Sequence, residues 1–238
     1  MSARDSTDAT VSLRSPAHSV LVLASGAAEA LRALSDTIEL RGRTAPGAPE
    51  LLVTDGDRRG MDTTSVGADT PVFAYSPRNF LELADAFMAL GVLSGEEGRG
   101  IKLAAQATSA VKHIRTIIDR LPSASFPRVF IQEKGSPLAT CGASSFLHAL
   151  VSEAGGKDLF ADRKDERIVV DREEVASREP DVILVAQETA VSERWSDTPA
   201  GRSGKVFALD LSAGVSPGPR SATLLVKVAR LLHPDLIP

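Results

Sequence analysis

SGEEGRGIKLAAQATSAVKHIRTIIDRL, from Ser94 to Leu121, is the one stretch long and regular enough for an unbroken helix of many turns. Its apolar residues recur at spacings of three and four, which places them on one helical face. They are Ala104, Ala107, Val111, Ile114, Ile118 and Leu121. Ser94 and Glu97 have the spacing of a capping box, and Pro122 would stop the helix. At about 1.5 Å per residue the helix would be roughly 40 Å long, so we expect it to cross between two lobes.

The sequence on both sides of this helix alternates strand patterns with helix patterns. Before it, strands are expected at 19–24, 38–44, 51–54 and 71–75, and helices at 27–34 and 78–90. After it, strands are expected at 128–132, 168–171, 181–186 and 205–209, and helices at 144–154, 173–178 and 221–232. This alternation predicts an α/β fold in which parallel sheets are covered by helices. The expected organisation is a flexible N-terminal tail (1–17), a first α/β lobe (18–93), the bridging helix (94–121) and a second α/β lobe (122–238).

Composition removes several classes of function. Because the chain has 27 basic and 31 acidic residues, no basic surface is expected and nucleic acid is not an expected partner. No run approaches the roughly 18 apolar residues of a membrane helix, so no membrane insertion is expected. Residues 1–17 contain Arg4, Asp5 and Asp8 and lack the apolar core of a secretory signal. The chain as written is therefore expected to be cytoplasmic, and a truncated start, the alternative, would make it periplasmic or cell-surface.

Motifs of catalysis and metal binding are missing from the sequence. It contains no Gly-x-Ser-x-Gly elbow, no phosphate-binding loop ending in Lys-Ser/Thr and no Gly-x-Gly-x-x-Gly after a strand. The four histidines do not lie at metal-ligand spacing from one another or from Cys141, the single cysteine, which also excludes an internal disulfide. We therefore expect a protein that is not an enzyme, with no catalytic residue, metal site or cofactor.

Polar stretches follow several predicted strands, at the edge where open α/β sheets bind ligands. The candidate ligand-binding residues in these stretches are Tyr75, Glu133, Cys141, Gln187, Trp195 and Ser216. Trp195, the only tryptophan, lies in the polar segment SERWSD, and stacking on a ligand competes with packing on the adjacent strand. Cys141 could ligate a metal of the ligand, or it could pack as a small hydrophobic residue.

The second half of the chain also resembles a known family. PLATCGASSFLHALVSEAGGKDLFAD (137–162) is similar to the signature of the substrate-binding proteins that serve ABC importers of vitamin B12, ferric siderophores and haem. VVDREEVASREPDVILVA (169–186), GKVFALD (204–210) and SPGPRSATLLVKVARLLHP (216–234) follow in the order typical of that family. SVLVLASGAAEALRAL (19–34) resembles its opening strand, turn and helix. Within the family the cobalamin-binding branch looks most similar.

This resemblance implies the class III periplasmic-binding-protein fold, two Rossmann-like lobes bridged by one rigid helix. It implies non-catalytic binding of a bulky metal chelate in the cleft between the lobes, above all cobalamin or another corrinoid, with haem and ferric siderophores as alternatives. It also implies an ABC permease as partner, with Glu173 at the position of a docking acid. Without the resemblance, Glu173 reads as a solvated acid in the first turn of a helix.

The sequence departs from the family pattern in three places. APGAPE (45–50) replaces a much longer passage that includes a helix with a second docking acid. Arg167 stands where the cobalamin branch has a tryptophan, and Ser212 stands at an acidic position. The missing docking helix, together with the lack of a secretory signal, favours a second hypothesis, a cytosolic protein that reuses the scaffold for sequestration, partner binding or an assembly step.

Overall fold

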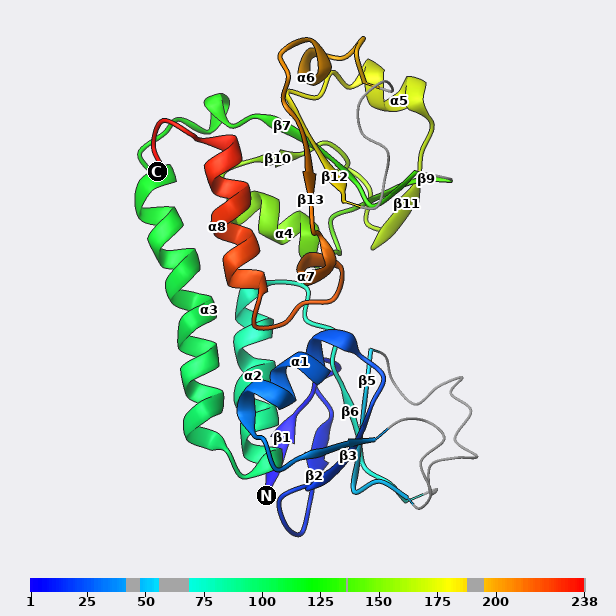
Figure 1. Ribbon diagram of the computed structural model, residues 1–238, viewed down its shortest axis with the longest axis vertical. Helices are drawn as coiled ribbons and strands as arrows, with labels where there is room; N and C mark the ends of the chain where they lie inside the picture. Colours follow the sequence, from blue (N-terminus) through cyan, green and yellow to red (C-terminus); the bar gives the residue numbers. More distant parts are fainter. Residues whose placement is uncertain (42–47, 56–68, 136, 188–194, 238) are drawn as a thin grey trace. The chain divides into compact units, whose positions relative to one another are not determined.

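The computed structural model describes residues 1–41, 48–55, 69–135, 137–187 and 195–237 (Figure 1). The chain divides into two compact units. The first unit comprises Met1–Thr108 and Ser216–Arg220, and the second comprises Ser109–Val215 and Ser221–Pro238. Helix α3 (Glu97–Ile118) carries the chain from the first unit into the second. The expected α/β fold, with two parallel-sheet units connected through a long helix, is confirmed.

The first unit is built on a four-stranded parallel sheet with the order β4-β3-β5-β6. Its strands are β3 (Ser19–Val22), β4 (Glu39–Arg41), β5 (Leu51–Thr54) and β6 (Val72–Ala74). Helices α1 (Ser25–Leu34) and α2 (Phe80–Ser94) accompany the sheet. All four residues of β5 are buried, as expected for an inner strand that is covered on both faces.

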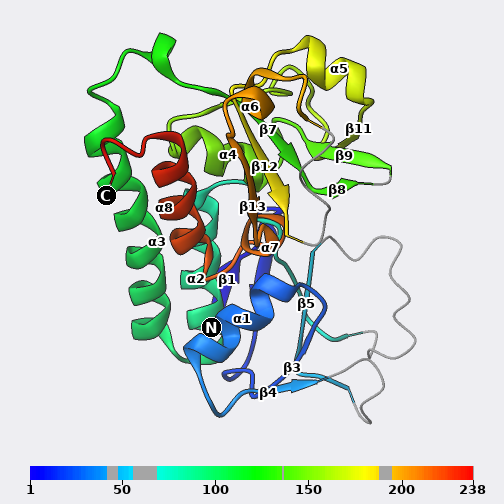
Figure 2. The same ribbon diagram turned by 45° about the horizontal axis from the view of Figure 1, so that its top comes forward.

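The second unit contains a parallel sheet with the order β10-β7-β12-β13 and an antiparallel sheet with the order β11-β9-β8, visible side by side in Figure 2. The parallel strands are β7 (Arg128–Gln132), β10 (Lys157–Asp158), β12 (Val182–Ala186) and β13 (Val206–Leu209). The antiparallel strands are β8 (Lys134–Gly135), β9 (Leu138–Cys141) and β11 (Arg167–Val169). The helices are α4 (Phe146–Glu153), α5 (Arg172–Ser177), α6 (Pro199–Arg202), α7 (Ser212–Val215) and α8 (Ser221–Leu232), with a 3-10 turn at Ser123–Ser125.

Aromatic rings form the centre of the second unit. The ring of Phe130 on β7 lies 5.3 Å from that of Trp195, edge to face, and 6.0 Å from that of Phe160. All three side chains are fully buried, and Val175 of α5 and Ile183 of β12 belong to the same cluster. Burying such rings together contributes more than their area alone, and the cluster holds α5 against the parallel sheet.

Helix α3 differs from the expected 94–121 helix at both ends. It spans 22 residues, Glu97–Ile118, and its apolar face is confirmed because Ala104, Ala107, Ile114 and Ile118 are buried. The capping role expected for Ser94 is wrong. Ser94 ends α2 instead, and its hydroxyl donates to the carbonyl of Leu90 at 2.7 Å. Gly95, with φ of +72°, terminates α2 in the left-handed conformation that glycine adopts without strain.

Two segments that looked irregular in the sequence contain strands. Within the expected flexible tail 1–17, β1 (Ser2–Arg4) pairs with β2 (Thr10–Ser12) in an antiparallel hairpin. The Asp5 carboxylate accepts hydrogen bonds from the backbone N–H groups of Thr7, Ala9 and Ala74, the last residue of β6. The bond from Ala74 fastens the hairpin to the sheet. In the expected loop after β7, β8 pairs with β9. Both hairpins have strands of only two to four residues, too short to leave a periodic pattern.

Candidate functional site

In the first unit, two candidate residues meet on the segment 216–220. Tyr75 follows β6, and its hydroxyl donates to the carbonyl oxygen of Pro217 at 2.8 Å. The Ser216 hydroxyl accepts a 3.0 Å hydrogen bond from the backbone N–H of Gly26, in the first turn of α1. A Cβ on Gly26 would lie 1.8 Å from the Pro217 oxygen, so only glycine permits this approach. The structure thus brings Tyr75 and Ser216 together as anchors of one segment.

The electrostatics of this anchor keep the tyrosine in its donor form. Tyr75 is 3% exposed. Burial, reinforced by the nearby Glu29 carboxylate, raises the pKa of Tyr75 far above the ordinary value of a phenol. Glu29 also accepts a 3.0 Å hydrogen bond from the guanidinium of Arg220, at the other end of the segment. Because the phenol stays protonated, it donates to Pro217 across the whole physiological pH range.

In the second unit, Glu133 and Gln187 follow the carboxyl ends of β7 and β12. The Glu133 carboxylate accepts hydrogen bonds of 3.0 and 2.7 Å from the Arg167 guanidinium. The Glu133 side chain is 7% exposed and that of Arg167 is 47% exposed, so the guanidinium covers its partner and faces solvent. Gln187 is exposed, and its backbone N–H donates to the Leu209 carbonyl of β13 at 2.8 Å. We call Glu133, Arg167 and Gln187 the second-unit rim.

Trp195 and Cys141 lie inside the second unit instead of lining a surface. The Trp195 indole is 1% exposed, and its N–H donates to the Gln132 side-chain oxygen at 3.0 Å. Of the two roles considered for Trp195, the structure shows packing inside the unit. A ring buried in this way is not accessible for stacking on a ligand. Cys141 is fully buried as well, and burial, with the nearby Asp158 carboxylate, raises the pKa of its thiol. A buried neutral thiol is a poor metal ligand, because the thiolate is the binding form.

Gln132 and Thr140 are polar residues of the second unit that sequence reasoning missed. Both are fully buried. Within the described part of the chain, the Gln132 side-chain nitrogen and the Thr140 hydroxyl have no hydrogen-bond partner. Gln132 is the last residue of β7, immediately before Glu133, so its unpartnered nitrogen is buried at the carboxyl end of that strand. Its position inside an apolar strand, RVFIQ, is the only signal that the sequence offers.

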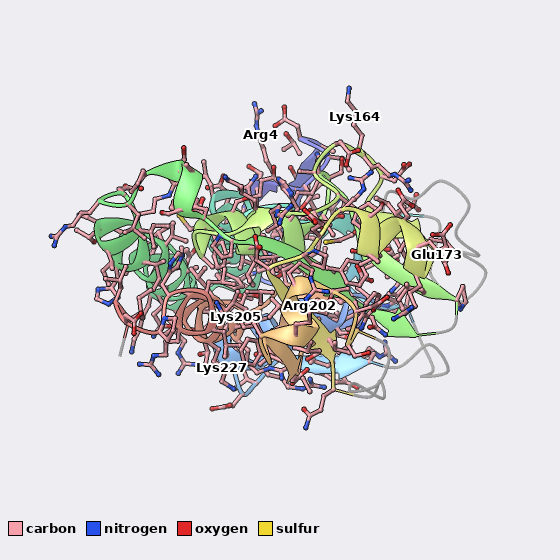
Figure 3. All side chains as sticks on the ribbon, turned by 90° about the horizontal axis from the view of Figure 1, so that it is seen from above. Arg4, Lys164, Glu173, Arg202, Lys205 and Lys227 are labelled. Carbon is pink, nitrogen blue, oxygen red and sulfur yellow. The ribbon has the colours of Figure 1, made fainter. Side chains whose placement is uncertain are left out.

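Arg167 lies on a strand of the antiparallel sheet, and Glu173 lies on a helix. Arg167 begins β11 and pairs in register with Cys141 of β9. Its bond to Glu133, 34 residues away, could not be read from the sequence. Glu173 lies in the first turn of α5 and is exposed, and Figure 3 shows its side chain directed away from the ribbon. Residues 45–47 of the APGAPE loop and 188–194 before Trp195 lie outside the described residues.

Two features are absent from the described part of the chain, a metal-ion cluster and a membrane-spanning helix. Among them, no three His, Cys, Asp or Glu side chains are grouped so that they could hold a metal ion. In the same part of the chain, no helix combines the length and the apolar character needed to cross a membrane.

Comparison with known proteins gives a family and a fold. Residues 45–213 match the family described as periplasmic binding protein. A vitamin B12-binding protein of Yersinia pestis (strain Pestoides F) is 29% identical over 116 residues, which is 49% of this chain and 40% of that protein. The chain thus matches less than half of the length of this curated relative.

Solved structures extend the likeness over nearly the whole chain. The periplasmic vitamin B12-binding protein of Vibrio cholerae superposes with a TM-score of 0.76 and 20% identity, covering 91% of this chain and 97% of that one. The molybdate periplasmic binding protein of Haemophilus influenzae reaches a TM-score of 0.80 with 17% identity, covering 99% and 92%. At such identities these superpositions show the fold, and the ligand is a separate question.

Proposed function

Because the chain belongs to the periplasmic binding protein family, we propose that it captures a metal chelate as the substrate-binding component of an ABC importer. The proposed ligand is cobalamin or another corrinoid, with haem and ferric siderophores as the alternatives. The observation that carries this proposal is the 29% identity to vitamin B12-binding proteins over 116 residues. Binding takes place without chemical change to the ligand, through hydrogen bonds and packing at preformed sheet edges.

The second-unit rim supports this choice of ligand by its chemistry. A corrinoid carries peripheral amides and a phosphate, and haem carries carboxylates, so all of these ligands present oxygen acceptors. The Arg167 guanidinium has five N–H donors in a fixed plane, and the hydrogen bonds to Glu133 use its Nε and Nη2 atoms. The Gln187 amide adds both a donor and an acceptor. We assign ligand contact to Arg167 and Gln187, and the positioning of the guanidinium to Glu133.

The other candidate residues act through the fold in this proposal. Tyr75 and Ser216 hold the segment 216–220 on α1 and β6. Trp195 and Cys141 pack inside the second unit, and the Trp195 indole fixes the Gln132 amide at the end of β7. Their replacement should lower stability more than ligand affinity.

The test is isothermal titration of the whole chain with cyanocobalamin, haem and a ferric hydroxamate siderophore, one at a time. We expect one of them to bind with a dissociation constant far below about 100 µM, which corresponds to about −5.5 kcal/mol. Arg167→Ala and Gln187→Ala should each weaken that binding at least fivefold. Lys205→Ala is the matched control, because the exposed Lys205 (labelled in Figure 3) precedes β13 at the amino edge of the parallel sheet, whereas Gln187 follows the carboxyl end of β12. Failure of all three chelates to bind more tightly than about 100 µM would remove the proposal.

Docking to the permease is a separate part of the proposal, assigned to Glu173. An exposed carboxylate in the first turn of a helix remains free to pair with a basic residue of a partner. Glu173→Gln should leave the chelate titration unchanged and lower chelate uptake by cells that carry the cognate importer. Uptake equal to that of the unmodified chain would show that Glu173 takes no part in docking.

A further inference from the structure

The first unit contains a pocket that lies away from the 216–220 segment and has no part in the proposed chelate site. It has a volume of about 520 Å³, within the range of small-molecule sites. The β1–β2 hairpin forms one side and helix α2 the other, and β1 lies beside α2 in Figure 1. Its apolar wall consists of Phe73, Ala86, Met88, Ala89 and Val92.

Charged side chains surround the rest of this hairpin pocket, with four carboxylates against two guanidinium groups. Each guanidinium already has a carboxylate. Arg4 binds Asp8 at 2.6 Å, and the Nε atom of Arg78 lies 3.8 Å from Glu82. Figure 3 shows the Arg4 side chain extending away from the ribbon. The Arg residues are therefore engaged, and the surplus charge of the lining is negative.

Asp85 differs from the other acids of the hairpin pocket. The Asp5 carboxylate accepts backbone hydrogen bonds, among them one from Ala74, and the Glu82 carboxylate accepts one from the backbone of Arg78. Asp85 is exposed, and within the described residues no hydrogen bond or ion pair engages its carboxylate. Met88 and Val92 follow Asp85 at helical spacings of three and seven, so the free charge and the apolar wall share one face of α2.

We propose that the hairpin pocket is a second binding site that takes a small organic cation with an aromatic or aliphatic body. The ammonium group pairs with Asp85, and the body lies on Met88 and Val92, where the thioether adapts to the shape of a ring. The lining disfavours an anion, because its guanidinium groups are already paired. It also disfavours a bare calcium ion, which needs six to eight oxygen ligands where this pocket offers one free carboxylate and an apolar wall.

The experiment uses the whole chain with its methionine methyl groups labelled with carbon-13. The sequence has three methionines, and the Met88 signal is assigned from its disappearance in Met88→Leu. Phenethylammonium is the probe, and 2-phenylethanol and 3-phenylpropionate are its neutral and anionic counterparts. We expect a saturable shift of the Met88 signal with the cation and at least tenfold weaker binding of the other two compounds.

Variants test the assigned charge. Asp85→Asn should weaken phenethylammonium binding at least fivefold. Asp36→Asn, which changes another exposed acid of the first unit outside the hairpin pocket, should leave it unchanged. The proposal is overturned if the Met88 signal does not shift saturably up to about 5 mM probe, if 2-phenylethanol binds as well, or if Asp85→Asn has no effect. Because the readout is local to Met88, a failed chelate titration would not bear on this result.

Discussion

The Tyr75 hydroxyl shows how a residue at the edge of a sheet can serve the fold. It is almost completely buried, its pKa is raised by burial, and its single donor goes to the Pro217 carbonyl. The same segment receives the Gly26 N–H at Ser216 and is paired with Glu29 through Arg220. Two side chains, those of Tyr75 and Glu29, and the backbone N–H of Gly26 therefore hold the five residues 216–220.

Replacing Tyr75 with Phe should lower the free energy of unfolding by about 1 kcal/mol, the usual net value of one hydrogen bond. The ring remains and only the donor is lost. The measurement is urea denaturation followed by circular dichroism. Ser177→Ala is the control, since among the described residues the exposed Ser177 hydroxyl donates to the carbonyl of Glu174 in its own helix. Equal stability of Tyr75→Phe and the unmodified chain would show that the bond to Pro217 contributes nothing.

The Trp195 indole combines a hydrogen bond to Gln132 with packing on Phe130. Trp195→Phe removes the hydrogen bond to Gln132 and part of the packing on Phe130. Because a buried acceptor is left unsatisfied, the free energy of unfolding should fall by about 1–3 kcal/mol. The dissociation constant of the chelate should stay within about threefold, a change worth less than 1 kcal/mol. A loss of affinity with unchanged stability would instead assign the indole to the ligand.

Helices α2 and α3 approach each other through glycine. A Cβ on Gly100 of α3 would lie 2.7 Å from the carbonyl oxygen of Phe87 and 3.1 Å from the Cα of Gly91, both on α2. Gly98, two residues earlier on the same helix, faces open space, with nothing within 4 Å of the position that a Cβ would occupy. Glycine is a poor helix former. The close approach of the α2 backbone explains the glycine at residue 100, but no such contact explains the glycine at residue 98.

Alanine at these two positions should therefore act in opposite directions. Gly100→Ala should destabilise the chain by about 1–3 kcal/mol, because two backbones would have to separate. Gly98→Ala should be neutral or stabilising by up to about 1 kcal/mol, because the unfolded chain loses freedom. Thermal unfolding of the two variants in parallel measures the difference. Equal effects of both substitutions would contradict the close approach of α2 and α3.

The end of α5 is paired with the turn after β10 through Arg178 and Asp162, at 2.7 Å. The hydrogen bond to Arg178 is the main cause that lowers the pKa of Asp162 below its ordinary value. A lowered pKa in the folded state adds stability above the unfolded value of about 3.9. That stability is lost as the pH falls through the folded value. Because the Asp162 side chain is 59% exposed, the contribution should remain below about 1 kcal/mol.

Thermal unfolding between pH 7 and pH 3 tests this pair. The unmodified chain should be slightly more stable than Asp162→Asn at pH 7, and the difference should shrink as the pH falls below the unfolded value of about 3.9. A difference that grows as the pH falls would mean that Arg178 does not stabilise the charged form of Asp162.

For the molecule as a whole, periodicity was enough wherever an element was long and apolar. β7, β5 and α8 have the bounds expected from the sequence, and the parallel sheets follow from alternating strands and helices. The β1–β2 hairpin was missed because strands of three polar or small residues leave no apolar run. Ser94 was misplaced because a serine followed by an acid suits the start of a helix, while the left-handed Gly95 places Ser94 at the end of another.

The candidate site was harder to predict because it depends on pairs distant in sequence. The polar neighbours SERWSD left ligand stacking and packing both open for Trp195, because its contacts, Phe130 and Gln132, lie more than sixty residues earlier. The bond between Glu133 and Arg167 spans 34 residues and joins a parallel sheet to an antiparallel one. Position at a strand end made Glu133 and Gln187 candidates, but the partner of Glu133 could be seen only in the structure.

We propose that one chain binds one metal chelate. The most direct measurement is gel filtration of the whole chain after incubation with equimolar cyanocobalamin, haem and ferric hydroxamate, with absorbance recorded across the eluate. We expect one of the three compounds to elute with the protein at one molecule per chain. Elution of all three with the small molecules would contradict it.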